Sequence, residues 1–152
     1  FIKKYLNSYD DEINHTLSNW VNSVENDNNM ILQMDIEGYE YETLICTDID
    51  ILKKFRIIII EFHHFQSIFN EYGFRMINSI FDKLSSQFYI AHIHPNSTSQ
   101  IYKHKNIQIP SILEYTFIRK DRVKSVEFSS NFPHKLDHDQ KFKLPKSFFQ
   151  FK

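Results

Sequence analysis

The stretch Met30–Leu44 constrains the fold more than any other part of the chain. It begins with a mostly apolar run of about six residues without helical periodicity, which predicts a buried strand. Two carboxylates, Asp35 and Glu37, end this run, and Gly38 follows as one of only two glycines in the chain. Because glycine adopts positive φ and allows close approach without strain, Gly38 predicts a tight turn into a helix.

Three further segments have strand character. Residues 56–64 contain four consecutive isoleucines, which predict a strand buried on both faces inside a parallel sheet. Residues 88–94 predict a third strand that stops at Pro95 and Asn96, because proline interrupts strand pairing. Residues 112–118 alternate and are rich in β-branched and aromatic side chains, which predicts a half-exposed strand.

Besides the helix after Gly38, two helices are predicted between or before these strands. The first follows the acidic residues Asp10–Glu12, which suit a helix N-terminus, and the second covers the apolar positions from Phe69 to Leu84. The apolar stripe of the first helix consists of Ile13, Leu17, Trp20, Val21 and Val24. This order predicts an α/β fold with a mostly parallel sheet, flanking helices and an antiparallel last strand.

Composition limits the class of protein. A chain of 152 residues suits one domain, 1–152, in which 122–152 is a less regular tail. A formal net charge of −1 gives no electrostatic case for binding nucleic acid. The longest apolar run, Ile57–Ile60, is far too short to cross a membrane. A single cysteine, Cys46, excludes an internal disulfide and suits a core thiol in a reducing, cytoplasmic compartment.

The predicted strand ends bring acids and imidazoles together. If the first three strands are parallel, their carboxyl ends share one edge, where open α/β sheets bind ligands. We therefore expect a candidate site at this edge. Its members are Asp35, Glu37, Glu61, His63, His64, His94 and Asn96.

Each candidate also has a structural interpretation. Asp35 is equally suited to cap the following helix, although a second acid at Glu37 favours a site. Glu61 needs a partner if buried, and Arg56 or a backbone amide would serve as well as a ligand. Neighbouring strand residues point to opposite faces, so only one of His63 and His64 is expected to reach the site.

Other histidines are weaker candidates. His92 and His94 share a strand face at a spacing that binds metals, but hydrogen-bonded histidines are commoner. Four further polar residues near the end of the chain have the types of metal ligands, but no predicted strand fixes them. They are His134, Asp137, His138 and Asp139, and we expect a solvated segment there.

The segment Asp35–Leu44 resembles the central motif of the FkbM-type methyltransferases, which depend on S-adenosylmethionine (SAM). Four other segments resemble the same family in the same order. They are Thr16–Val21, Ile58–His63, His92–Asn96 and Leu113–Lys120. The resemblance implies a Rossmann-like enzyme that moves a methyl group from SAM to a hydroxyl of a small molecule or glycan, such as a sugar or another secondary metabolite.

The resemblance also implies roles for individual residues. Asp35 would lie beside the methyl-transfer centre, as a polar contact or general base, and Gly38 would contact the cofactor. Glu37 and His63 would complete the catalytic set, and the family pattern favours His63 over His64. The acceptor side would comprise Glu61, His94 and Asn96, and no metal is assigned.

One family feature is missing. A SAM site in this fold needs a glycine-rich turn after the first strand and an acid after the second, yet no glycine precedes Gly38. Because the chain also begins with Phe1 rather than methionine, we expect the carboxyl-terminal half of a catalytic domain, inactive in isolation. A protein that has lost its cofactor half is the alternative.

Two other functions remain open. A metal-dependent hydrolase would use Asp35, Glu37, His63 and His94, a mixed nitrogen and oxygen set that suits zinc or manganese. A non-catalytic remnant would only bind a partner, and substitution of Asp35 would then cost it no function.

Overall fold

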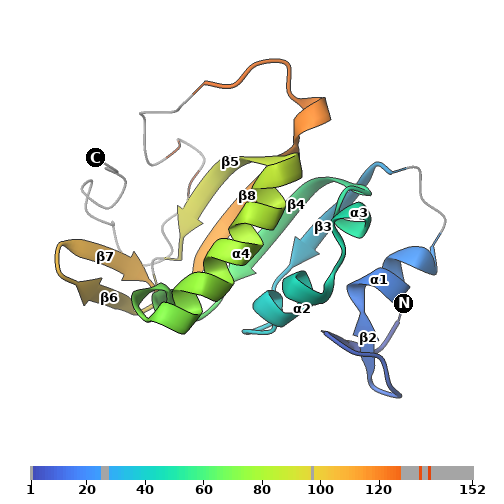
Figure 1. The fold of residues 1–152 in the computed structure, drawn as a ribbon, viewed down its shortest axis with the longest axis horizontal. Coiled ribbons are helices and arrows are strands. Elements are labelled where there is room, and N and C mark those ends of the chain that lie inside the picture. Colours follow the sequence, from blue (N-terminus) through green and yellow to red (C-terminus); the bar gives the residue numbers. More distant parts are fainter. Residues whose placement is uncertain (1, 25–27, 97, 128–133, 135–136, 138–152) are drawn as a thin grey trace.

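The computed structural model describes residues 2–24, 28–96, 98–127, 134 and 137. Figure 1 shows the helices and strands in chain order. They are β1 (Tyr5–Asn7), β2 (Asn14–Thr16), α1 (Leu17–Asn22), β3 (Met30–Met34), α2 (Glu40–Cys46), α3 (Ile49–Leu52), β4 (Phe55–Phe62), η1 (Phe65–Phe69), α4 (Glu71–Gln87), β5 (Phe88–Pro95), β6 (Ile101–His104), β7 (Ile107–Pro110), β8 (Leu113–Arg119) and η2 (Lys120–Arg122).

A four-stranded sheet in the order β3-β4-β8-β5 forms the centre of the fold. β3 and β4 pair in parallel, whereas β8 is antiparallel to both of its neighbours, β4 and β5. Three strands therefore point the same way, and β3, β4 and β5 end at one edge, which we call the carboxyl edge. The predicted α/β class and the antiparallel last strand are confirmed, and the sheet as a whole is mixed.

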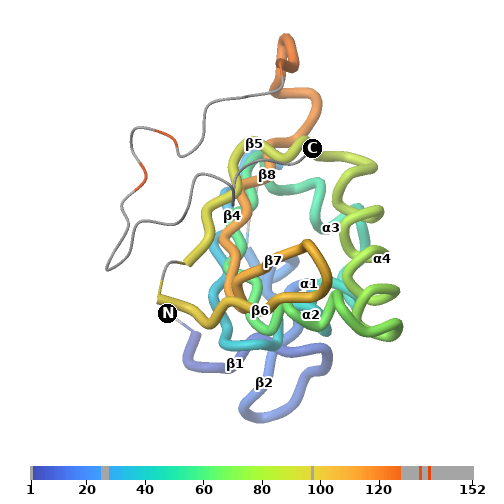
Figure 2. The backbone as a smooth tube through the Cα atoms, turned by 90° about the vertical axis from the view of Figure 1, so that its left-hand side faces the viewer, coloured from blue at the N-terminus to red at the C-terminus, as the bar shows by residue number. Residues whose placement is uncertain are grey.

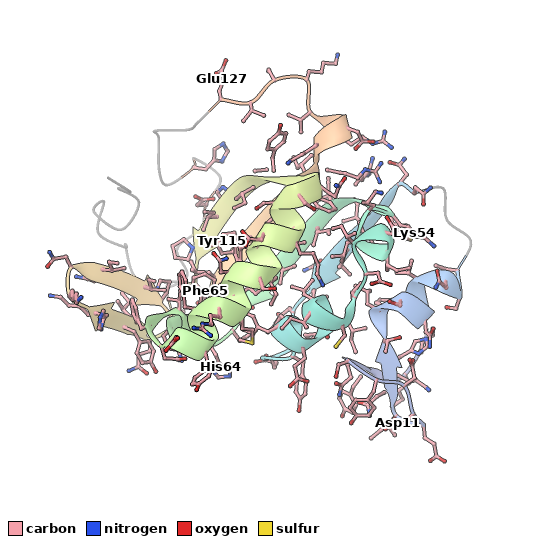
Figure 3. The ribbon with its side chains drawn as sticks, in the orientation of Figure 1. Asp11, Lys54, His64, Phe65, Tyr115 and Glu127 are labelled. Carbon is pink, nitrogen blue, oxygen red and sulfur yellow. The ribbon has the colours of Figure 1, made fainter. Side chains whose placement is uncertain are left out.

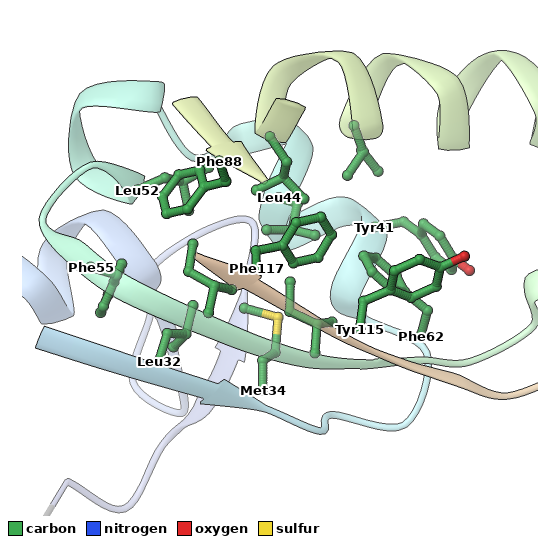
Figure 4. Close-up of a cluster of buried hydrophobic side chains, with 14 of the residues drawn as sticks. Leu32, Met34, Tyr41, Leu44, Leu52, Phe55, Phe62, Phe88, Tyr115 and Phe117 are labelled. Atoms are coloured by element: carbon green, nitrogen blue, oxygen red, sulfur yellow. The ribbon is translucent and has the colours of Figure 1, made fainter. Parts of the chain in front are cut away.

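The core lies on one face of this sheet. Side chains of alternate residues, among them Met34, Phe62 and Phe117, point toward the helices, as Figure 4 shows. Figure 2 shows α3 and α4 on one side of the strands. Ile57 and Ile59 point the other way and are only half-buried, so the prediction of a strand buried on both faces is wrong for β4.

Aromatic rings fill the part of the core below the carboxyl edge. The ring of Phe62 lies 5.5 Å from those of Tyr41 and Phe81, and 5.7 Å from that of Tyr115. Aromatic pairs at such distances add to the stabilisation that burial gives. Burial also raises the pKa of Tyr115 to about 12. The high phenylalanine and tyrosine content therefore has a structural use: it supports the edge where the strands end.

The N-terminal helix is shorter than predicted. It begins at Leu17, with Thr16 as its N-cap, and Ile13 before it is 61% exposed. The acids expected at the helix N-terminus instead shape a turn between β1 and β2. Asp10 accepts hydrogen bonds from the Thr16 amide and hydroxyl, and Asp11 accepts them from the amides of Ile13 and Asn14. These side-chain bonds compete with helix formation.

Two other predictions differ from the structure. Residues 101–110, for which the sequence pattern predicts no strand, form the hairpin β6–β7, with Lys105 at positive φ in its turn. Cys46 is exposed at the end of α2 and is not a core thiol. No helix in the described part of the chain is long and apolar enough to cross a membrane.

Lys83 joins α4 to the end of α2. Its ammonium group donates hydrogen bonds to the carbonyl oxygens of Leu44, Ile45 and Thr47, at 2.9, 2.8 and 3.2 Å. The last carbonyls of a helix lack partners within the helix, and a cation there also suits the helix dipole. This contact fixes α2 against α4, and α2 begins at the candidate site.

We expect Lys83→Met to destabilise the protein by about 1.5–3 kcal/mol, the usual range for hydrogen bonds that involve a charged group. Urea unfolding measures the change. On the same helix, Arg75→Met removes only an exposed ion pair with Glu71 and should change stability by less than about 1 kcal/mol. Equal effects of the two substitutions would show that Lys83 does not hold α2.

Candidate functional site

The turn between β3 and α2 is the first part of the site. Two successive residues adopt positive φ there, Glu37 at 57° and Gly38 at 109°. A Cβ atom at position 38 would lie 3.2 Å from the ring of His64, so both reasons for a glycine apply. Asp35 does not cap the helix, whose N-cap residue is Tyr39. The turn therefore leaves the Asp35 and Glu37 carboxylates at the carboxyl edge.

Glu40 holds this turn from inside the protein. Its side chain is fully buried, and its carboxylate accepts hydrogen bonds from the Ile36 amide at 3.1 Å and from the Gly38 amide at 3.1 and 3.2 Å. A third partner is Nδ1 of His63, 3.0 Å from Oε1. Three donors satisfy a buried carboxylate that would otherwise be costly to desolvate. The sequence motif contains Glu40, but its residue type and position alone indicate no role for it in the site.

His63 is the centre of the site. It is 7% exposed, and its Nε2 atom faces three carboxylates at the carboxyl edge. The distances from Nε2 are 3.4 Å to Glu37, 3.9 Å to Asp35 and 4.0 Å to Glu61. Because an ionised carboxylate only accepts, Glu40 requires the Nδ1 atom to carry hydrogen, and Nε2 is left to exchange a proton. We call Asp35, Glu37, Glu61 and His63 the acidic rim.

The pKa of His63 reflects opposing effects. Burial of the ring disfavours the charged imidazolium, but the hydrogen bond to Glu40 and the negative charges of Glu40, Glu37 and Glu61 favour it. The net result is that the pKa of His63 lies above the ordinary value of 6.5. The imidazolium form is therefore stabilised by its carboxylate neighbours.

Asn96 joins the acidic rim from the end of β5. Its Nδ2 atom donates to Oε1 of Glu61 at 3.0 Å, so among the described residues Asn96, and neither Arg56 nor a backbone amide, is the hydrogen-bond partner of Glu61. Glu114 on β8 lies directly opposite Glu61 in the ladder. Residues opposite each other in an antiparallel pair share a face, so Glu114 adds a further carboxylate that the sequence analysis missed.

His94 does not join the acidic rim. Because β8 lies between β4 and β5, two strand spacings, about 10 Å, separate His94 from Glu61. The Nδ1 atom of His94 lies instead 3.9 Å from Asp137, and Nε2 of His92 lies 3.0 Å from the same carboxylate. The expectation of a solvated segment is therefore wrong for Asp137. The rest of that expectation concerned His134, which is exposed, and two positions outside the described residues, His138 and Asp139.

His64 also lies outside the acidic rim. It is exposed, has a φ of 55° and precedes η1, and its ring packs against Gly38. Figure 3 labels His64 near the start of α4, and it also labels Phe65, the first residue of η1, and Tyr115 of β8. Only one of the two adjacent histidines, His63, reaches the carboxylates, as the sequence predicted.

The acidic rim fits one end of SAM. Carboxylates suit the positively charged sulfonium group that carries the methyl, by charge complementarity. The amides of Ile36 and Gly38 already donate to Glu40, so this turn has no cradle for the anionic carboxylate of the cofactor. The described residues thus fit the methyl end of SAM and not its remaining groups.

The turn gives a stability prediction. We expect Gly38→Ala to destabilise the protein by about 1–3 kcal/mol, because a side chain at positive φ is strained and His64 must move. Urea unfolding measures this change. Glu42→Ala in the exposed part of α2 should stay within about 0.5 kcal/mol. A Gly38→Ala variant as stable as the parent would show that the positive φ at position 38 does not require glycine.

The raised pKa of His63 predicts how stability depends on pH. The folded state binds the proton more tightly than the unfolded state, so the contribution of His63 is fully present below about pH 6.5 and is lost as the pH rises through its raised native pKa. The stability difference between the parent and His63→Gln should therefore shrink with rising pH. Urea unfolding between about pH 5 and pH 9 tests this. A difference that is constant across this range would refute the pKa assignment.

Comparison with known proteins identifies the family. A family model described as the methyltransferase FkbM domain matches residues 7–90, more than half of the chain. No curated protein and no solved structure matches. The matched region contains the whole acidic rim and Glu40, whereas residues 92–96 and Asp137 lie beyond it. The chain belongs to the FkbM methyltransferase domain family.

Proposed function

We propose that this protein is a SAM-dependent O-methyltransferase whose acidic rim binds and deprotonates the hydroxyl of a small-molecule or glycan acceptor. The observation that carries the proposal is the pair formed by Glu40 and His63. A buried carboxylate orients an imidazole whose second nitrogen faces the carboxyl edge, as in other sites where histidine moves a proton. The single, exposed cysteine supports a reducing, cytoplasmic setting.

His63 acts as the general base in this scheme. When bound, SAM would supply the electrophilic methyl group, and the electron pair of its methyl–sulfur bond would leave with the sulfur. Nε2 of neutral His63 would accept the proton of the acceptor hydroxyl as the oxygen of that hydroxyl takes the methyl group, and Glu40 would stabilise the imidazolium that results. Asp35 and Glu61 accept hydrogen bonds from further acceptor hydroxyls, and the amide of Asn96 keeps Glu61 in place.

An apolar cavity of about 410 Å³ lies between α4, η1 and the hairpin β6–β7. Its lining residues on β8, Leu113 and Tyr115, point to the helix-covered face of the sheet, whereas Glu61 and Glu114 point to the other face. No residue of the acidic rim lines this cavity, so we do not assign it to the acceptor.

The metal site of the hydrolase hypothesis lacks one of its expected ligands in this structure. It required His94 beside Asp35 and His63, but β8 separates β5 from β4. We therefore do not retain that function.

Methyl transfer by the complete gene product tests the proposal. We expect SAM to bind in a calorimetric titration, and labelled methyl to pass to members of a panel of hydroxylated metabolites and glycans. His63→Gln should lower kcat by about 10²–10⁴-fold, the usual contribution of a general base. His104→Gln, on the hairpin, should retain full activity.

The pH profile of the same reaction separates a base from a merely structural histidine. The rate should rise with pH as His63 loses its proton, and this rise should lie above pH 6.5. Glu40→Gln should move the rise to lower pH, because it removes the carboxylate that contributes most to raising the pKa of His63. Failure to bind SAM, or full activity of Asp35→Asn and His63→Gln, would overturn the proposal in favour of a non-catalytic role.

A further inference from the structure

A second cluster of ligand-type side chains lies on the same sheet, away from the acidic rim. Its members are His92 and His94 on β5 together with Asp137. The two imidazole rings are stacked, with centroids 6.3 Å apart and planes 15° apart, because the residues are two positions apart on one face of the strand. One ligand atom from each residue lies within 4.8 Å of the others.

The distances in this cluster suit a bound cation. Oδ1 of Asp137 lies 3.0 Å from Nε2 of His92 and 3.9 Å from Nδ1 of His94. Tetrahedral coordination with bonds of about 2.0–2.1 Å would place neighbouring ligand atoms roughly 3.3 Å apart. Only small side-chain movements separate the observed arrangement from that geometry.

One polar group of the cluster points to a ligand. The Nδ1 atom of His94 is buried and has no hydrogen-bond partner among the described residues. The side chain of Asp137 is only 9% exposed, and its carboxylate is held between the two chain segments by His92 and His134. The amide of His134 donates to Oδ2 of Asp137 at 2.7 Å, and such a bond fixes the orientation of a ligating carboxylate.

We propose that His92, His94 and Asp137 bind one divalent transition-metal ion. Two imidazole nitrogens and one carboxylate oxygen form a set that suits Zn²⁺, Fe²⁺ or Co²⁺, and it disfavours Mg²⁺ and Ca²⁺, which prefer oxygen ligands. The metal joins the segment at Asp137 to β5. This site lies beyond the region that matches the family, so it is independent of the proposed methyl transfer.

The acidic rim is a poorer metal site than this cluster. Asp35, Glu61 and His63 also have ligand atoms within 4.8 Å of one another. They provide only one imidazole, however, and Asp35 is half-exposed. The Nε2 atom of His63 is 3.9 Å or more from both carboxylates of this set. We therefore assign the metal to the cluster on β5.

Metal titration of the complete gene product tests this proposal. After treatment with a chelator, the protein is titrated with Zn²⁺ in a calorimeter and with Co²⁺, whose absorption spectrum reports coordination. We expect the protein to bind one equivalent of metal and its melting temperature to rise. A ligand that binds only the folded state stabilises that state. In His94→Gln and in Asp137→Asn, the affinity for this equivalent should fall about a hundredfold or more.

Two matched variants locate the metal. His63→Gln removes the imidazole of the acidic rim, and His104→Gln removes an exposed imidazole on the hairpin. Both variants should still bind one equivalent of metal. Circular dichroism of each metal-free variant shows whether it is folded. Absence of binding to the parent, or binding that survives Asp137→Asn and His94→Gln but is lost in His63→Gln, would overturn the proposal.

Discussion

The buried carboxylate of Glu40 is the interaction on which the site depends. It lies at the start of α2 and receives hydrogen bonds from the turn after β3 and from His63 at the end of β4. One side chain thus fixes a strained turn, the first residue of a helix and the orientation of an imidazole. Because the carboxylate is fully buried, loss of any one of its three donors would leave one of its hydrogen bonds unreplaced by water, and this makes the arrangement rigid.

The sheet order explains why there are two polar clusters. All three strands that point the same way end at the carboxyl edge, but β8 is inserted between β4 and β5. Residues at the end of β5 are therefore divided. Asn96 reaches back to Glu61, whereas His94 remains two strands away and faces Asp137. A parallel arrangement with β4 and β5 adjacent would have merged these clusters into one site.

Much of the fold was predictable from local patterns. The apolar runs at β3, β4 and β5 and the glycine before α2 gave correct strands and a correct turn, because burial and positive φ restrict residue types strongly. The helix expected from Ile13 onward was wrong because Asp10 and Asp11 use their side chains to bind backbone amides, a choice that hydrophobic spacing does not reveal.

The site was predictable only in part. His63 and the carboxylates of the acidic rim follow from strand ends meeting at one edge. The role of Glu40 depends on a backbone turn that brings two amides to one carboxylate, and that of Asp137 depends on a contact across 43 or more positions of sequence with β5. Glu114 was missed because its significance comes from strand register and not from its own neighbours in the chain.

The protonation state of His63 reports directly on its contact with Glu40. Nuclear magnetic resonance of the protein with ¹⁵N-labelled histidine measures both the pKa of His63 and which ring nitrogen carries the proton in the neutral form. We expect a pKa above 6.5 and, at higher pH, hydrogen on Nδ1, where Glu40 accepts it. A pKa at or below 6.5, or a neutral ring with hydrogen on Nε2, would contradict the claim that Glu40 orients His63 toward the acidic rim.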